Sequence, residues 1–333
     1  MRRIRVAQIG TSQNSHGNMI WKALVENPDV FEIAGYAFPE NEGEKFPKHA
    51  EKFRDYQELS VEQILADPTI EAVVIETEEI YLTQYAILAA KAGKHIHMEK
   101  PGGIDPAEFR ELIGLMKQSG KVFHTGYMYR YNPVLLDIRK RIAAGELGQI
   151  VSVEAQMNCI YPDATKRHWL ETFPGGMMFF LGCHLIDLVL QLQGMPKRII
   201  PMNKSTGLDG VTAKDFGMVA LEYEKGWSFV KAVACEVGGY QRRQLVITGT
   251  KGTIELKPFE MMEGPLHRTR KTEFFDTNWR SPFVSEDSEL YNRYAPMMVA
   301  FAEMVARERE NPYTCDYELS LYEMILQCCG ETP

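Results

Sequence analysis

The chain has 333 residues, of which 45% are hydrophobic and 25% charged, so it can form two globular domains and lacks the composition of a disordered protein. Its formal net charge of −8 argues against nucleic acids and anionic membranes as partners, because both are polyanions. We therefore expect a small-molecule substrate, no nucleic-acid partner and no membrane partner.

The N-terminal residues and the cysteines indicate the cellular compartment. A strand-like run begins at Ile4 without the apolar core of a signal peptide, and no apolar run reaches membrane-spanning length. The six cysteines contain no Cys-x-x-Cys pair and are too sparse for a disulfide framework. We expect a cytoplasmic protein with reduced thiols and no metal site. For Cys183, burial as a small apolar residue explains the position better than a nucleophilic role.

The first 126 residues alternate short β-rich runs with amphipathic helical stretches. The expected strands cover residues 4–9, 31–37, 71–76, 94–98 and 121–125. The expected helices cover residues 16–27, 44–53, 61–66, 80–92 and 105–119. This βαβ order predicts a parallel sheet with helices on both faces, so we expect residues 1–126 to form a Rossmann dinucleotide-binding domain.

The pattern changes after Gly126. A helix is expected from Pro133 to Gly145 or Gly148, and another over residues 177–193. The expected strands cover residues 150–158, 197–204, 214–223, 227–236, 241–249 and 252–257. Consecutive strands predict a large, mostly antiparallel open sheet in an α+β domain over residues 127–333. Two final helices flank Asn311-Pro312, and they can pack back on the first domain.

Two segments carry candidate chemistry. The first ends in Glu99-Lys100-Pro101 at a strand tip, where open α/β sheets bind their ligands. The second places His184 and Asp187 three residues apart on a predicted helix, facing one side. A lysine can polarise a substrate oxygen while an imidazole takes its proton, so the pair suits alcohol oxidation or carbonyl reduction.

Around these motifs the chain resembles the glucose-fructose oxidoreductase / inositol dehydrogenase / rhizopine catabolism family of nicotinamide-dependent oxidoreductases. The resemblance rests on the opening strand with Gly10 and on residues 72–77, 89–101, 175–187 and 249–254. It implies NAD or NADP as cofactor and a homodimer or homotetramer through the C-terminal sheet. It also implies that Lys100 holds the reacting oxygen, that His184 is the acid/base, that Asp187 orients the substrate or the imidazole, and that Glu99 contacts the nicotinamide ribose.

The resemblance also implies a set of cofactor-binding residues: Gly10, Thr11, Ser12, Gln13, Asn14, Phe38, Thr77, Glu99 and Lys100. Ser12 replaces the second glycine of the phosphate loop, which weakens or re-angles binding. Phe38 stands where an acid would hold the ribose 2′-hydroxyl, so the choice between NAD and NADP stays open. Phe38 could stack on adenine or simply be a buried aromatic at the strand end.

Three carboxylates, those of Glu76, Glu78 and Glu79, cluster near the expected polyanion site. A solvated helix N-terminus would explain them, because the helix dipole favours acidic groups there. In the catalytic helix, Phe180 stands where inositol dehydrogenase-like members carry an aspartate, which argues against an inositol-like substrate.

Candidate substrate contacts are Tyr127, Arg130, His168 and Asp187, together with Tyr161 and Trp169. Packing at a domain hinge would explain all of them except Asp187 equally well, and Asp187 could equally be an internal hydrogen-bonding group of the helix packing. The leading hypothesis is an NAD(P)-dependent oxidoreductase of a sugar, polyol or related hydroxy compound. The alternatives are a non-catalytic ligand-binding or regulatory protein, and a lyase or glycosidase that uses bound nicotinamide for transient oxidation. Fold alone does not choose among them.

Overall fold

A computed structural model describes residues 2–278 and 280–332. The chain divides into two compact units: a first unit of Met1–Met128 with Tyr294–Tyr322, and a second unit of Tyr129–Arg293 with Glu323–Pro333. The first unit is therefore discontinuous in sequence. The domain ranges 1–126 and 127–333 stay a prediction.

The first unit is built on a parallel sheet of strands in the order β2-β1-β3-β4-β5. These strands are β1 (Ile4–Ile9), β2 (Phe31–Ala37), β3 (Ala72–Ile75), β4 (His95–Met98) and β5 (Phe123–Thr125). All side chains of β3 are buried, as expected for a central parallel strand covered on both faces. The predicted Rossmann domain is confirmed.

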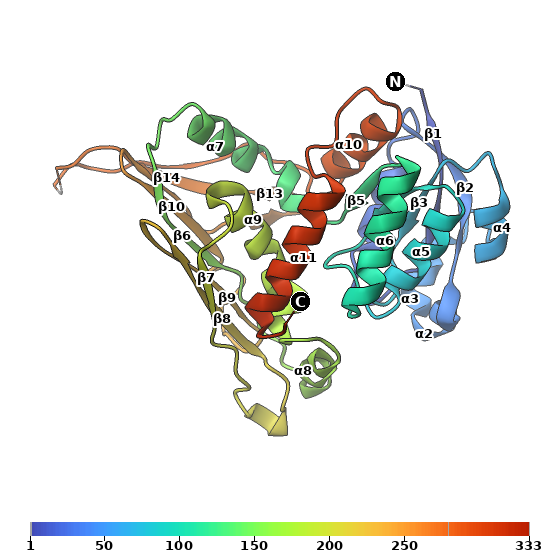
Figure 1. Ribbon diagram of the computed structural model, residues 1–333, viewed down its shortest axis with the longest axis horizontal. Helices are drawn as coiled ribbons and strands as arrows, with labels where there is room; N and C mark the ends of the chain where they lie inside the picture. The colour runs from blue at the N-terminus through green and yellow to red at the C-terminus, as the bar shows by residue number, and fades with distance from the viewer. Residues whose placement is uncertain (1, 279, 333) are drawn as a thin grey trace. The chain divides into compact units, whose positions relative to one another are not determined.

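Helices pack on this sheet in two groups (Figure 1). α1 (Gly17–Val25) contacts β2 and α10 (Ala295–Val305), and α5 (Leu82–Lys91) contacts β3, β4 and α6 (Pro106–Ser119). Local sequence sets two of these boundaries. The Asp105 carboxylate accepts the N–H of Ala107 and so caps α6, whereas Gly93, with φ of +72°, lets the chain turn after α5.

The prediction of a single helix over residues 44–53 is wrong. The structure has α2 (Glu42–Lys45), α3 (Pro47–Ala50) and a short 3-10 turn at Glu51–Phe53 in its place. Phe46 has φ −126° and ψ 57°, because a residue before proline is driven out of the helical region. The remaining helix of this region, α4 (Val61–Ala66), agrees with the prediction and begins with a capping box between Ser60 and Gln63.

The second unit is built on a sheet in the order β15-β14-β11-β10-β6-β9-β8-β7. Its strands are β6 (Ile150–Gln156), β7 (Arg198–Pro201), β8 (Phe216–Tyr223), β9 (Gly226–Val233), β10 (Gln244–Gly249), β11 (Thr253–Leu256), β14 (Arg270–Phe274) and β15 (Ser285–Asp287). Every described pair in it is antiparallel except β6 with β9. The expected large, mostly antiparallel sheet is confirmed.

Helices of the second unit are α7 (Pro133–Ala143), α8 (Ala164–Trp169) and α9 (Cys183–Gln193). α9 packs on β6 and β9, and a π-helical turn at Met178–Gly182 precedes it (Figure 1). The sequence analysis missed α8, β14, β15 and a hairpin of β12 (Met261–Glu263) with β13 (Leu266–Arg268). α11 (Cys315–Cys329) runs from the first unit into the second. Within residues 2–278 and 280–332, no helix is long and apolar enough to cross a membrane.

Candidate cofactor cradle and catalytic residues

The tips of β1 and β3 lie against each other at the carboxyl edge of the parallel sheet, where such folds bind ligands. Gly10 follows β1 and has φ of +92°. A Cβ at this position would lie 2.5 Å from the backbone nitrogen of Thr77, so only glycine fits. The turn therefore has the geometry required of the first glycine in a dinucleotide-binding loop.

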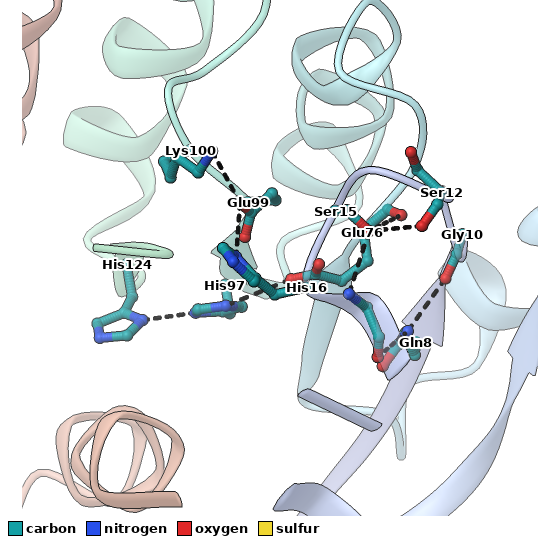
Figure 2. A network of polar contacts seen from close by, with 11 residues as sticks. Gln8, Gly10, Ser12, Ser15, His16, Glu76, His97, Glu99, Lys100 and His124 are labelled. Atoms are coloured by element: carbon teal, nitrogen blue, oxygen red, sulfur yellow. Dashed lines mark hydrogen bonds and ion pairs between the residues drawn. The ribbon is translucent and has the colours of Figure 1, made fainter. Parts of the chain in front are cut away.

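Hydrogen bonds hold the loop after Gly10 in place (Figure 2). The N–H of Ser12 donates to the carbonyl of Glu76 at 3.0 Å, and the Gln8 side-chain amide donates to the carbonyls of Gly10 and Gly17 at 3.0 and 3.1 Å. Gln13 is exposed and Asn14 half-buried, so their side chains are accessible at the loop surface. The helix that follows, α1, has no acidic residue in its first turn, which suits an anionic ligand.

Glu42 is a residue of this edge that sequence reasoning missed. Its carboxylate accepts the backbone N–H of Thr11 at 2.8 Å and that of Glu78 at 2.7 Å, and the residue is fully buried. Burial raises its pKa to about 7, although both N–H groups act in the opposite direction. Glu40 and Asn41 have φ of 56° and 59°, and these left-handed residues fold the chain back over the strand tips. Asn41 is of a residue type enriched in this region, whereas nothing in the sequence marks Glu40.

The three-carboxylate cluster is not the solvated helix N-terminus that the sequence suggested. Glu76 and Glu79 are 0% and 3% exposed, and α5 starts only at Leu82. Burial, with repulsion from Glu99 and Glu79, raises the pKa of Glu76 well above its usual range. Burial likewise raises the pKa of Glu79 to about 7, against the attraction of Lys100. Glu78 forms an ion pair with Lys45 at 2.8 Å, so this edge carries less negative charge than a count of its acids implies.

At the tip of β4, Glu99 and Lys100 are buried side by side (Figure 2). The Lys100 ammonium lies 3.5 Å from the Glu99 carboxylate, and His16 Nδ1 lies 3.1 Å from the same oxygen. Burial alone would raise the pKa of Glu99, but His16, Lys100 and His97 together hold it below its usual value. Glu99 is therefore an anion fixed between two basic groups, beside the cradle of Gly10 and Ser12.

Beneath this tip, two histidines form a buried pair. His97 Nδ1 and His124 Nδ1 are 2.6 Å apart, so one donates and the other accepts (Figure 2). His97 Nε2 lies 3.6 Å from a carboxyl oxygen of Glu76. Burial lowers the pKa of His97 to about 4, against attraction from Glu99, so this ring is neutral at physiological pH. Phe301 of α10 packs on both rings and completes this core.

Phe38 and Thr77 complete the predicted cofactor set. Phe38 is half-buried, with its ring 4.7 Å from that of Tyr36 and 5.1 Å from that of Phe53. It lines two surface cavities of about 470 and 610 Å³. Thr77 is fully buried against Gly10. Phe38 thus packs in an aromatic cluster and is also partly accessible.

In the second unit, His184 lies in the first turn of α9 and is 2% exposed. The ring of Tyr129 meets it edge-on, with centroids 5.3 Å apart. Tyr129 donates its hydroxyl to Glu260 at 2.6 Å and accepts from Arg293 at 2.8 Å, so its ring position is fixed. Sequence reasoning missed Tyr129, although it lies within the Tyr-rich segment that supplied two other candidates.

Arg130 and Asp187 were predicted as separate substrate contacts, and the structure pairs them. Arg130 Nε lies 3.1 and 3.2 Å from the two carboxylate oxygens, and a terminal nitrogen lies 2.9 Å from one of them. The Gln191 amide also donates to Asp187 at 2.7 Å. Both charged side chains are 1% exposed. The pairing of this guanidinium with this carboxylate fixes the orientation of α9 one turn after His184.

The other predicted substrate contacts lie in different surroundings. Tyr127 is buried in the first unit, and His168 is an exposed residue of α8, 3.4 Å from Glu171. Phe180 packs edge-on against Trp169 at 4.8 Å, which accounts for an aromatic residue at this position. The predicted site residues therefore form two groups: Gly10, Thr11, Ser12, Thr77, Glu99 and Lys100 in the first unit, and Arg130, His184 and Asp187 in the second.

The residues present fit a dinucleotide at most points. The Gly10 turn, the acid-free start of α1 and the tip of β4 are the features such a ligand requires. Glu42 is the exception, because it already holds the N–H of Thr11. By fold and by this cradle, the chain is of the class of nicotinamide-dependent oxidoreductases with a Rossmann domain.

Sequence comparison defines the family. Residues 4–127 match the model described as oxidoreductase family, NAD-binding Rossmann fold, and residues 135–255 match the GFO/IDH/MocA C-terminal domain. The chain belongs to the GFO/IDH/MocA family of oxidoreductases. This confirms the family that the motifs indicated.

The curated relatives match only part of this chain. The scyllo-inositol 2-dehydrogenase (NADP(+)) IolW of Bacillus subtilis is 29% identical over 178 residues, which cover 52% of this chain and 49% of that protein. A D-xylose 1-dehydrogenase (NADP(+)) of Haloferax volcanii is 27% identical over 168 residues, or 50% of this chain and 51% of that one. The chain thus matches about half the length of these curated relatives. Levoglucosan dehydrogenase in complex with NADH shares the fold, with a TM-score of 0.81, 18% identity and coverage of 98% and 97% of the two chains.

Proposed function

We propose that the protein is an NAD(P)-dependent dehydrogenase of a sugar, polyol or related hydroxy compound, with Lys100 and His184 at the reacting oxygen. The observation that carries the proposal is the tip of β4. There, a lysine and a glutamate are almost completely buried 3.5 Å apart, on the same sheet edge as a glycine turn of the kind found in dinucleotide-binding loops. Burying an ion pair is costly unless the site uses it, so this arrangement favours catalysis over surface solvation.

Each residue has a distinct task in this proposal. Lys100 donates a hydrogen bond to the substrate oxygen and stabilises the negative charge that develops there. His184 takes the hydroxyl proton during oxidation and returns it during reduction. Glu99, held as an anion by His16, keeps the Lys100 ammonium in position. The nicotinamide, when bound, supplies the hydride acceptor or donor.

The substrate class is supported by what related proteins are named for. The relatives include dehydrogenases of scyllo-inositol and D-xylose, and the structural neighbours include one of levoglucosan. These names denote a cyclic polyol, a sugar and an anhydrosugar. We therefore propose the same chemical class here, with the cofactor drawn from NAD and NADP.

The test is a substrate panel with both cofactors. Purified protein is incubated with NAD or NADP and with a set of aldoses, inositols and anhydrosugars, and NAD(P)H formation is followed by absorbance. Net reduction with at least one member supports the proposal. Binding of a nucleotide without turnover of any member would favour a ligand-binding protein. Phe180 motivates that second candidate, because it leaves His184 without an aspartate one helical turn earlier.

A further inference from the structure

The backbone N–H groups of Thr11 and Glu78 point to one spot from two different strand tips. Thr11 follows Gly10 after β1, and Glu78 follows Thr77 after β3. Both donate to a single group, the carboxylate of Glu42, at 2.8 and 2.7 Å. Convergent amides at the carboxyl edge of a parallel sheet are the usual means by which this fold holds oxygen atoms of a nucleotide.

Glu42 is held there by its own segment. α2 begins at Glu42, after the left-handed residues Glu40 and Asn41, and Lys45 of the same helix forms an ion pair with Glu78 at 2.8 Å. The Tyr85 hydroxyl of α5 donates to Glu40 at 2.9 Å, which fixes the start of the turn. The segment thus closes over the strand tips and leaves Glu42 fully buried.

We propose that the amides of Thr11 and Glu78 are a subsite for an oxygen of the dinucleotide, and that Glu42 is an internal anion that occupies it and competes with the cofactor. The inference rests on the proposed function, since it assigns a role within the same cradle. A ligand oxygen can reach the Thr11 N–H only when the carboxylate moves away. Cofactor binding must therefore turn the Glu42 carboxyl away from the two amides while it stays buried in the closed segment, where it lies beside an anionic ligand and has to be protonated.

The competition depends on pH with a definite sign. Burial holds the pKa of Glu42 at about 7, so protonation near neutral pH removes its charge. A protonated carboxyl has one O–H in place of an acceptor oxygen, so it cannot accept both N–H groups equally well. Protonation weakens the internal contact, and NADH binding tightens as pH falls from 8 to 6. By linkage, NADH binding above neutral pH takes up protons.

Other titratable groups near this edge are Glu78, Lys45, Glu76 and Glu79, and the last also titrates near pH 7. The readout is therefore the difference between wild type and a variant at Glu42 alone. Glu42→Gln removes the charge while keeping shape and one acceptor oxygen. Glu44→Gln is the matched control, because Glu44 is an exposed residue of the same short helix.

The experiment is calorimetric titration of the full chain with NADH at pH 6, 7 and 8. We expect Glu42→Gln to bind NADH at least about tenfold tighter than wild type at pH 8, since a charge-assisted contact no longer has to be broken. Its affinity should vary less with pH than that of wild type. Glu44→Gln should bind within about twofold of wild type, as expected of an exposed charge.

Two results would overturn the inference while leaving the proposed function intact. One is weaker NADH binding by Glu42→Gln, which would make Glu42 a supporting group of the cofactor site. The other is equal wild-type affinity at pH 6 and pH 8. Absence of binding by wild type and variant alike at millimolar NADH would overturn both proposals. Binding by the variant alone would support the competition directly.

A second measurement covers the case in which Glu42→Gln does not fold. Titration of wild type with NADH at pH 7.5, in two buffers of different ionisation enthalpy, gives the number of protons taken up. Uptake of a measurable fraction of a proton that persists in the Glu79→Gln variant supports the inference, because Glu79 also titrates near pH 7. Zero uptake or net release overturns it, whatever the behaviour of Glu42→Gln.

Discussion

At the strand tips of the first unit, Glu76 and Glu79 are buried with raised pKa values, whereas the buried Asp187 of the second unit is held by the guanidinium of Arg130. The protonation of Glu76 and Glu79 is sensitive to pH and to the arrival of a charged ligand, because burial has raised their pKa values. The Asp187 carboxylate is fixed by an opposite charge and by hydrogen bonds. Buried ionisable groups therefore have two roles in this protein. Carboxyls with raised pKa values surround the proposed cofactor cradle, and the ion pair of Arg130 with Asp187 positions α9, the helix that carries His184.

The largest expected effect is on stability in the second unit. Arg130→Met leaves the Asp187 carboxylate buried without its cation, so the free energy of unfolding should fall by about 3 to 5 kcal/mol. Urea denaturation followed by circular dichroism measures it. The double variant Arg130→Met/Asp187→Leu should recover much of this loss, because it removes both charges. A single variant within about 0.5 kcal/mol of wild type would show that the pair is not fixed as described.

The next effect is on turnover. Lys100→Met and His184→Ala should each lower kcat at least about a hundredfold, equivalent to about 2.7 kcal/mol of transition-state stabilisation. NADH affinity, measured by titration, should stay close to that of wild type. Lys91→Met is the control for loss of a lysine, because Lys91 is exposed on α5 and pairs with Glu111. Unchanged turnover in both variants would remove these residues from the site.

A pH-dependent gain in stability is expected at the acidic edge. The pKa of Glu79 is about 7 in the folded chain against an ordinary 4.5. Below pH 4 the residue is protonated in both states, so Glu79→Gln should leave stability unchanged there. Above pH 7 the folded chain must bury the charge, so the variant should be more stable by about 3 kcal/mol.

The check is urea denaturation at pH 4 and pH 8, with Glu44→Gln as an exposed control. An equal difference between variant and wild type at both pH values would contradict the raised pKa of Glu79.

The smallest expected effect is on the free energy of unfolding when Gln191, the uncharged hydrogen-bond partner of Asp187, is replaced. Gln191→Met removes a 2.7 Å hydrogen bond to Asp187 but leaves the guanidinium in place, so it should cost only about 1 kcal/mol. Urea denaturation is again the measurement, and Gln149→Met at an exposed position should change stability by less than about 0.5 kcal/mol. A loss as large as that of Arg130→Met would mean that Gln191, and not the charge, holds Asp187.

The parts of the fold that follow from local sequence could be predicted. Alternating apolar runs located all of the strands β1 to β5, and the rule that ligands lie at the carboxyl edge placed Gly10 and Lys100 correctly at strand tips. The missed elements are short or highly charged: β14 contains Arg270 and Lys271, and β15 consists of Ser285–Asp287. Such strands are specified by pairing with a neighbour and carry little pattern of their own.

The site was less predictable because its decisive contacts join distant residues. Arg130 and Asp187 are 57 positions apart, and Glu42 and Thr11 are 31 apart. Neither pairing leaves a periodic signal. The turn that brings Glu42 back uses two residues in the left-handed region, of which only Asn41 is of a type enriched there. The raised pKa values follow from burial, which is known only once the packing is known.

The discontinuity of the first unit has a consequence for how the protein is made. The ribosome delivers the five strands of the parallel sheet early, but α10, whose Phe301 covers His97 and His124, emerges almost 180 residues after His124. Until then those two rings lack their cover, and the whole second sheet is synthesised in the interval. The first unit therefore begins to fold before the second sheet is made but is completed only after it, so the core around His97 and His124 closes only once α10 has emerged.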